Sequence, residues 1–289
     1  MTDLHERHPD LDALLPVEIA RKAEAIGVAK ARLETGRLLA LAILAGAFIG
    51  LGAMFATTVL AGTNGALPFG PARLIVGVAF SLGLILVIVG GAELFTGNAL
   101  MVMALGAGRI SISELLRAWA LVFIGNFGGA VATALMVFLA GQPRAGGGAV
   151  ATAAVALAEV KVALPFMQAF FMGVLCNVLV CLAVWLSLGA RSTSDKILAI
   201  IFPVSAFVAA GFEHSVANMY IVPMGLLIIN FAPDMLSSPA LSASGALTTA
   251  VFLWTLIPVT LGNVFGGGVL VGGVYWFIYL RPSGDVENS

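Results

Sequence analysis

The chain consists of long apolar runs separated by short polar stretches. A helix needs about 20 apolar residues to cross about 30 Å of hydrocarbon, and runs of at least this length fall at roughly 38–61, 73–107, 113–140, 162–189, 196–229 and 246–280. This pattern predicts an all-α polytopic membrane protein with six transmembrane helices within residues 37–281. The composition agrees, because 60% of the 289 residues are hydrophobic and only 10% are charged, unlike soluble domains.

The polar ends of the chain indicate its orientation. Segment 1–36 precedes the first apolar run, and segment 282–289 follows the last. When the connections are counted from the N-terminus, one side receives most of the basic residues, and the other receives only Arg73, Arg144 and Lys161. The positive-inside rule therefore predicts that both termini are cytoplasmic. Apolar residues at helical spacing within 11–33 predict an amphipathic helix at that face of the lipid bilayer.

The second and fifth runs are too long for one simple span, and each has a polar interruption. The stretches "GGAELFTGN" (90–98) and "AGFEHSVAN" (210–218) share the pattern Gly-x-Glu-x-x-x-x-Asn. The third and sixth runs share Gly-Asn-x-x-Gly. The residues that these patterns pair are Glu93 with Glu213, Asn98 with Asn218, and Asn126 with Asn263. We infer two homologous halves, one at about 37–140 and the other at about 150–281.

Each predicted half has three spans, which is an odd number, so the second half must enter the membrane from the opposite side. The sequence thus predicts two inverted three-helix repeats, as in aquaporins, with the broken second and fifth helices facing each other near the midplane. Irregular backbone at this depth is tolerated only where protein buries it or a polar cavity lines it. A transport path is the simplest interpretation.

The interruptions contain residues that could act on a permeating solute. Each restarted helix presents backbone N–H groups, which favour an anion. Glu93 and Glu213 are expected to accept hydrogen bonds from the backbone of their own breaks, and a direct proton relay is the alternative. His214 can carry a proton at physiological pH, and a role in permeation competes with simple interhelical hydrogen bonding. The hydroxyl of Thr96 could bond an imidazole or a small anion.

Other polar residues have two interpretations each. Lys161, at the expected start of the fourth span, either extends to the membrane interface or draws anions into a vestibule, and Asn177 lies deeper in the same run. Asn126 and Asn263 precede glycines and are expected to join closely packed helices. The apolar residues Phe80, Leu84, Phe207, Leu94 and Phe95 lie near the interruptions. They could be ordinary core residues or form constrictions that exclude water.

Several classes of function are disfavoured. The few basic residues form no stripe for nucleic acid, and Cys176 and Cys181 lack nearby ligands for a metal site, so we expect neither a metal nor a cofactor. Enzymatic activity is not expected: Ser215 follows His214 directly, and adjacent residues do not easily form a nucleophile and base pair. A neutral-solute channel of the aquaporin type should have Asn-Pro-Ala at both breaks, and neither break contains proline.

The quoted interruptions are part of longer stretches that resemble a known family. "GAELFTGN", "GVLCNVLVCLAVWLSLGARS", "FVAAGFEHSVANMYIVPMG" and "LIPVTLGNVFGGGVLVGGVYWFIYLR" closely resemble the formate/nitrite transporter family. "LLPVEIARKAEAIGVAKA" and "PFGPARLIVGVAFSLGLILVIVGGAELFT" are most similar to its formate-channel branch. The resemblance implies a homopentamer in the bacterial inner membrane, in which each protomer has its own pore for small monovalent anions such as formate and nitrite. The N-terminal segment looks like the pH-responsive gate of the family.

The resemblance also implies roles for individual residues. His214 becomes the central pore histidine with Thr96 as its partner, and Lys161 and Asn177 belong to the vestibule. The remaining assignments are a cytoplasmic constriction of Phe80, Leu84 and Phe207 and a periplasmic constriction of Leu94, Phe95 and Val180. We expect pH-dependent formate permeation, with protons as a second partner. Nitrite or hydrosulfide as substrate stays open, because the named filter residues are shared within the family and "TGN" after Phe95 is closer to nitrite-branch members. A proton-coupled carrier instead of a channel stays open as well.

Overall fold

The computed structural model describes residues 12–63, 65–237, 245 and 247–281, and the regular structure of this part of the chain is helical. The predicted tail 282–289 lies outside the described residues. The helices are α1 (Pro16–Ala31), α2 (Thr35–Thr63), α3 (Phe69–Gly90), α4 (Val102–Gly106), α5 (Ile112–Leu139), α6 (Ala149–Val162), α7 (Phe166–Gly189), α8 (Thr193–Ala209), α9 (Ser215–Phe231), α10 (Thr249–Val264) and α11 (Val274–Tyr279). A 3₁₀ turn, Gly97–Met101, precedes α4, and a π-helical stretch, Phe265–Gly273, joins α10 to α11.

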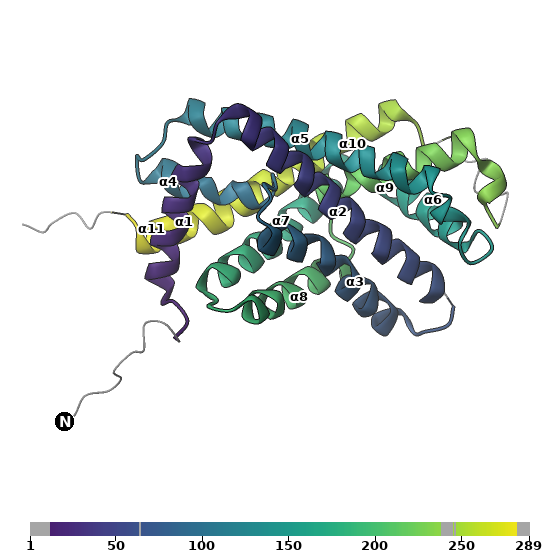
Figure 1. Cartoon of the computed structure of the whole chain (residues 1–289), viewed down its shortest axis with the longest axis horizontal. Coiled ribbons are helices and arrows are strands. Elements are labelled where there is room, and N and C mark those ends of the chain that lie inside the picture. Colours follow the sequence, from purple (N-terminus) through teal and green to yellow (C-terminus); the bar gives the residue numbers. More distant parts are fainter. Residues whose placement is uncertain (1–11, 64, 238–244, 246, 282–289) are drawn as a thin grey trace, which may run out of the picture.

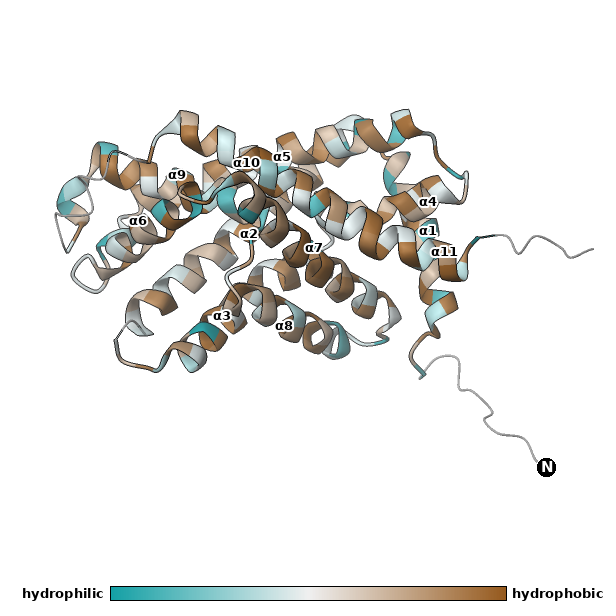
Figure 2. Cartoon of the chain, turned by 180° about the vertical axis from the view of Figure 1, so that it is seen from behind, coloured by the Kyte–Doolittle hydropathy of each residue, from teal (hydrophilic) through white to brown (hydrophobic). Residues whose placement is uncertain are grey.

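Five helical segments of the described chain are long and apolar enough to cross a membrane. They are α2, α3, α5, α7 and the composite of α10 and α11. Brown, hydrophobic positions predominate along these helices in Figure 2. The expected span at 196–229 is divided between α8 and α9, each of 17 residues. The chain is therefore a multi-pass membrane protein.

Helix α1 lies against the body of the protein. Its residues Ile19, Ala20 and Ala23 are buried, and it contacts α4, α7 and the 3₁₀ turn. The Lys22 Nζ atom donates a hydrogen bond to the Leu188 carbonyl at the end of α7 (2.9 Å). The apolar face expected from the sequence thus packs on protein.

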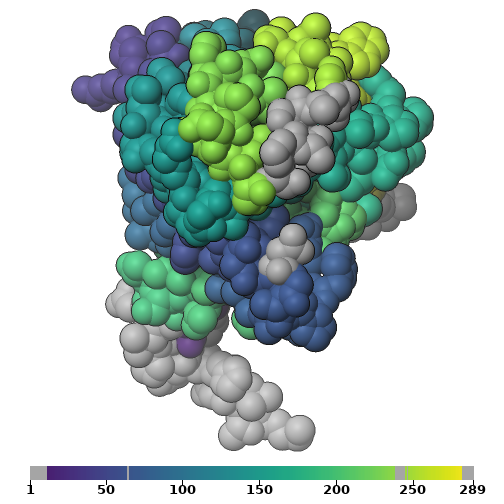
Figure 3. Space-filling view, turned by 90° about the vertical axis from the view of Figure 1, so that its right-hand side faces the viewer, coloured from purple at the N-terminus to yellow at the C-terminus, as the bar shows by residue number. Residues whose placement is uncertain are grey.

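Helix α6 is an element that the sequence pattern did not predict. Lys161 lies in its last turn, and not at the start of the fourth span as expected. The reason is Pro165, which disfavours helical backbone at the residue before it, so α6 ends at Val162 and α7 begins at Phe166. The end of the molecule remote from α1 is formed by α6, the end of α2, the start of α3 and residues 232–237 after α9 (Figure 3).

Two pairs of helices approach closely at glycines. A Cβ built on Gly46 of α2 or Gly129 of α5 would collide with backbone of the other helix. Gly262 and Gly266 make equally close contacts with the backbone of α7. Small residues allow such approach in membrane proteins, where packing and hydrogen bonds hold helices together. These two contacts position the asparagines described below.

Both long runs with polar interruptions are broken in the structure. Helix α3 ends at Gly90, and the next residue, Gly91, has a φ of 78°. Helix α8 ends at Ala209, and Gly211 has a φ of 76°. L-amino acids with a side chain rarely adopt this left-handed backbone. The helices restart differently, because the first continues as the 3₁₀ turn and short α4 whereas the second continues as the regular helix α9.

Candidate functional site

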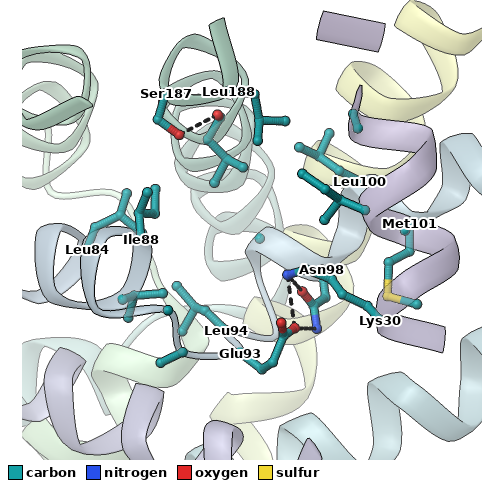
Figure 4. A pocket seen from close by; sticks show the side chains of 18 residues that line it. Lys30, Leu84, Ile88, Glu93, Leu94, Asn98, Leu100, Met101, Ser187 and Leu188 are labelled. Carbon is teal, nitrogen blue, oxygen red and sulfur yellow. Dashed lines mark hydrogen bonds and ion pairs between the residues drawn. The ribbon is translucent and has the colours of Figure 1, made fainter. Parts of the chain in front are cut away.

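The first break is organised around Glu93. Its backbone N–H donates to the Leu41 carbonyl of α2 (3.2 Å). Its carboxylate lies 2.9 Å from Lys30 Nζ of α1 and accepts a hydrogen bond from Asn98 Nδ2 (2.9 Å). Lys30 also donates to Asn98 Oδ1 (2.7 Å), which closes the three-membered cluster in Figure 4. Lys30 was not among the predicted site residues, because it lies far from Glu93 along the chain.

The second break is organised in the same way around Glu213. Its backbone N–H donates to the Met172 carbonyl of α7 (3.3 Å). Oε1 lies 2.8 Å from Lys161 Nζ, and Oε2 accepts from Asn218 Nδ2 (2.7 Å). Lys161 thus takes the place at this break that Lys30 takes at the first.

The expected bonds of the two carboxylates need a correction. Glu93 and Glu213 were expected to accept from backbone N–H groups of their own breaks, but the described partners of both are a lysine and an asparagine side chain. The physical reason is charge. A buried carboxylate is tolerated when it is paired with a cation and hydrogen-bonded, and amide side chains satisfy the nearby backbone.

Asn126 binds the first break to its neighbouring helix. Its Oδ1 atom accepts the Phe95 N–H (2.8 Å), and its Nδ2 donates to the carbonyls of Ala42 (2.7 Å) and Glu93 (2.9 Å). Asn126 is completely buried. It satisfies backbone groups that the interrupted helix leaves open, which buried backbone requires.

Asn263 does the same at the second break. Its Oδ1 accepts the Ser215 N–H (2.9 Å), and its Nδ2 donates to the carbonyls of Gly173 (2.8 Å) and Glu213 (2.9 Å). Each acceptor and donor matches one in the set around Asn126. The expected role of both asparagines in joining packed helices is therefore present, and both also fix the irregular backbone.

The two breaks meet at Thr96 and His214. Thr96 Oγ1 lies 3.0 Å from His214 Nε2, and both residues are buried. His214 is also the N-cap of α9, where its Nδ1 accepts the Ala217 N–H (3.0 Å). A ring nitrogen that accepts carries no proton, so the neutral ring has its proton on Nε2 and donates it to Thr96.

Asn177 holds the backbone of Thr96 by a hydrogen bond. Its Nδ2 donates to the carbonyls of Thr96 (3.1 Å) and Asn263 (2.6 Å), and the Cys181 thiol lies 3.5 Å from the same Thr96 carbonyl. Asn177 is completely buried and lines neither cavity described below, although the sequence suggested a vestibule residue. Cys181 was expected to be an inert core residue, and its contact with Thr96 has no signal in the sequence.

Two cavities lie at the two breaks, one lined by Leu94 and Gly97, which flank the Phe95–Thr96 segment, and the other by His214. One, of about 240 Å³, is lined by Lys30, Glu93, Leu84 and Leu94 together with residues of α1 and α7 (Figure 4). The other, of about 220 Å³, is lined by residues of α2, α3, α6, α8 and the second break, among them Arg73, Phe80, Lys161, Phe207, Glu213 and His214.

The apolar side chains group differently from the sequence expectation. Phe80 and Phe207 meet edge to face, with ring centroids 5.7 Å apart, in the cavity of Lys161. Leu84 was expected beside them, but it lines the cavity of Lys30 with Leu94. The ring of Phe207 also stacks on His214 at 6.0 Å. The Phe207 ring therefore covers one face of the imidazole in the cavity that Lys161 lines.

Phe95 and Val180 line neither of these cavities and belong to the core. Phe95 packs against Phe123, with centroids 5.1 Å apart, and against Trp119. Val180 is 1% exposed. Phe95 packs toward α5, and Leu94, Phe95 and Val180 belong to one buried cluster. Their place in one constriction stays a prediction.

The chain is similar in sequence to known membrane transporters. The sequence model of the family described as "Formate/nitrite transporter" matches residues 17–277. The "Formate channel FocA" of Escherichia coli strain K12 is 44% identical over 276 residues, which cover 94% of this chain and 96% of that protein. The "Probable formate transporter" of Methanothermobacter thermautotrophicus is 38% identical over 285 residues, covering 92% of this chain and 97% of that protein.

Two solved structures have the same fold. "Pentameric formate channel with formate bound" superimposes with a TM-score of 0.79 at 43% identity, covering 86% of this chain and 98% of that chain. "FNT family ion channel" gives a TM-score of 0.77 at 31% identity, covering 90% of this chain and 98% of that chain. Both matches extend over nearly the whole of the solved chains.

Proposed function

The chain belongs to the formate/nitrite transporter family, and from this membership we propose that it is a pentameric formate channel. It is a transport protein and not an enzyme. The observation that carries the proposal is the hydrogen bond between Thr96 and His214, which joins two breaks that each border a cavity lined by an ion-paired lysine. Formate as the substrate and the pentamer as the assembly are proposed from the names of similar proteins.

The permeation path runs from one cavity to the other past the Thr96–His214 pair. An anion first meets Lys161 or Lys30, depending on its direction. It then passes an apolar pair, Phe80 with Phe207 or Leu84 with Leu94, before it reaches the imidazole. Apolar constrictions of this kind exclude water and hydrated ions. The cavity of Leu84 and Leu94 is lined by α1, so with the N-terminal segment in the cytoplasm the leucine pair faces the cytoplasm and the phenylalanine pair faces the periplasm. This reverses the sides that were expected for the two constrictions, except for Leu84.

The matched contacts support an inverted repeat. The carbonyls of Leu41 and Met172 accept the backbone N–H groups of Glu93 and Glu213. The offset in sequence between Leu41 and Met172 equals the offset between Lys30 and Lys161. We therefore extend the first repeat to include α1, so that α1 corresponds to α6. An odd number of membrane crossings in each half then inverts the second half relative to the first.

The central pair has a defined chemistry for a small carboxylate. A bare anion pays a large desolvation cost between apolar walls, and the Nε2–H of His214 and the hydroxyl of Thr96 are the hydrogen-bond donors there. Lending a proton to formate, so that neutral formic acid crosses, requires a second proton on the ring. That proton would occupy Nδ1 and displace the Ala217 N–H. Losing an N-cap costs about 1 kcal/mol, and burial of His214 adds a desolvation cost for the charged ring.

The outer surface suits a lipid bilayer and an oligomer. Large apolar side chains such as Phe202 (75% exposed) and Trp254 (64% exposed) face outward. In water such a surface would be unfavourable. Lipid covers part of it in the proposed assembly, and neighbouring protomers cover the rest.

Substrate-resolved uptake into proteoliposomes tests the proposed function. Formate, nitrite and hydrosulfide are compared with inside and outside pH set independently, in the wild type and in His214→Ala. Formate uptake that exceeds nitrite uptake, accelerates with outside acidity and is lost in the variant supports a formate channel that works through His214. Faster nitrite or hydrosulfide uptake overturns formate as the substrate, and flux indifferent to pH and to His214 reduces the histidine to a structural residue.

A further inference from the structure

The cavity beside His214 contains a cation that has no role so far. Arg73 of α3 lines this cavity together with Lys161 and Glu213. Lys161 and Glu213 form an ion pair at 2.8 Å, so their charges largely cancel at a distance. Within the described part of the chain, no carboxylate forms an ion pair with Arg73. The positive charge of this cavity therefore comes from Arg73 more than from Lys161.

Backbone carbonyls hold the guanidinium of Arg73 at the second break. Nη2 donates to the Val208 carbonyl (2.7 Å), and Nε donates more weakly to the Ala209 carbonyl (3.5 Å). A Cβ built on Gly211 would lie 3.6 Å from Nη2, which shows that the guanidinium lies against the break itself. Arginine has five N–H donors. Its side chain is only partly buried, so donors remain for an anion in the cavity.

Capping of α8 is the simpler role for Arg73, since the last carbonyls of a helix lack partners within it. The first break argues against a need for such a cap. There, Ile88 and Val89 occupy the positions of Val208 and Ala209, and no side chain of the described residues donates to their carbonyls. Both helix ends also close with their own backbone, because Gly91 N–H donates to the Val87 carbonyl and Gly211 N–H donates to the Val208 carbonyl. A cation at the second break thus has a purpose beyond closing the helix.

We propose that Arg73 is the residue that draws anions into the cavity beside His214. This inference rests on the proposed anion transport. A charge on the wall of a cavity with apolar sides raises the local concentration of counter-ions, and a guanidinium can hold a carboxylate by two parallel hydrogen bonds. Because Arg73 is partly exposed, salt screens its field within about 8 to 10 Å at physiological ionic strength. The attraction therefore depends on ionic strength.

The first experiment measures formate uptake into proteoliposomes for Arg73→Gln and Arg73→Lys at several ionic strengths, set with an impermeant salt. Arg73→Gln should lower the initial rate roughly threefold or more at low ionic strength, and the difference should shrink toward none at high ionic strength. Arg73→Lys should stay near the wild type. Arg144→Gln is the matched control, because Arg144 pairs with Asp234 on the surface and does not line the cavity.

A second experiment changes the charge at position 73 after the protein has folded. Cys176 and Cys181 are completely buried, so thiol reagents should modify only the new cysteine of Arg73→Cys. A methanethiosulfonate with an ammonium group should restore uptake at low ionic strength, and one with a sulfonate group should lower it further. Equal effects of the two reagents would mean that size and not charge matters, which would overturn the proposal.

The remaining outcomes are also decisive. An Arg73→Gln variant that matches the wild type at low ionic strength, or that loses the same fraction of flux at every ionic strength, overturns the inference. So does a chain that fails to assemble without Arg73, because the residue would then serve folding. Wild-type protein that carries no formate overturns the proposed function instead, so the two failures are distinguishable.

Discussion

Thr96 Oγ1 accepts a hydrogen bond from His214 Nε2 at 3.0 Å, and this bond joins the two interrupted helices. The direction of the bond follows from the other ring nitrogen, which accepts the Ala217 N–H. The hydroxyl hydrogen of Thr96 is then available to a second acceptor. A small anion at this point can accept the Thr96 hydroxyl hydrogen, and it reaches the Nε2–H only by sharing or displacing the bond to Thr96. Substrate binding is thereby tied to the relative position of the two breaks.

Replacing Thr96 by valine tests this bond. Val216 occupies the equivalent position of the second break, so the size of valine suits this backbone. The change leaves the buried Nε2–H without its acceptor, so we expect the protein to lose about 1 to 3 kcal/mol of stability. We also expect formate uptake to fall at least roughly tenfold, as when an enzyme loses one hydrogen-bond donor to a developing charge. Thr96→Ser should retain most of both. A valine variant with wild-type uptake would remove Thr96 from the mechanism.

Asn126→Ala and Asn263→Ala should be similarly destabilising. Each asparagine makes three hydrogen bonds to buried backbone, and each group left unsatisfied costs about 1 to 3 kcal/mol. We expect a loss of roughly 3 kcal/mol or more, measured by thermal unfolding in detergent. The control is Asn230→Ala, whose side chain bonds only within its own helix and should change stability little. Unequal losses at the two breaks would argue against their equivalence.

Removing Lys161 alone should lower the stability of the protein more than removing the charges of both Lys161 and Glu213. Lys161 and Glu213 are 11% and 3% exposed, and removing one partner of such a pair costs about 3 to 5 kcal/mol because the other charge stays buried alone. We therefore expect Lys161→Met to destabilise strongly. The double variant Lys161→Met with Glu213→Gln should recover part of the loss. Losses that simply add in a double-mutant cycle of thermal stabilities would show that the pair is not coupled.

The sequence predicted the parts of the site that are local in the chain. The interruptions after Gly90 and Ala209 carry their own signals, namely glycine, a charged residue and the loss of apolar pattern. The matched positions of Asn126 and Asn263 were also visible, because the same short motif occurs twice. The contact of Thr96 with His214 was expected from the family resemblance, and the structure contains it.

The parts that were missed depend on distant contacts or on rotamers. Lys30 meets Glu93 only because α1 folds back onto the 3₁₀ turn, and its helix lies before the first apolar run. Its position relative to Lys161 in the repeat was the signal that could have revealed it. The grouping of Leu84 with Leu94 depends on which face of α3 points to which cavity. Phe80 lies one helical turn before Leu84, and hydrophobicity alone does not tell which of the two cavities each side chain lines.

Gly267 of the π-helical stretch is predicted to control the position of Thr96 without contacting it. A Cβ at Gly267 would collide with Asn177 Nδ2 and would lie 2.6 Å from Cys181 Sγ, the two groups that donate to the Thr96 carbonyl. We expect Gly267→Ala to cost about 1 to 3 kcal/mol as overpacking and to lower formate uptake. In Gly268→Ala the new methyl group would lie 3.4 Å from Val102 Cγ2, an ordinary contact, so this control should be nearly neutral in thermal stability and uptake. If the two variants behave alike, the support of Thr96 by Asn177 and Cys181 is not what requires glycine at position 267.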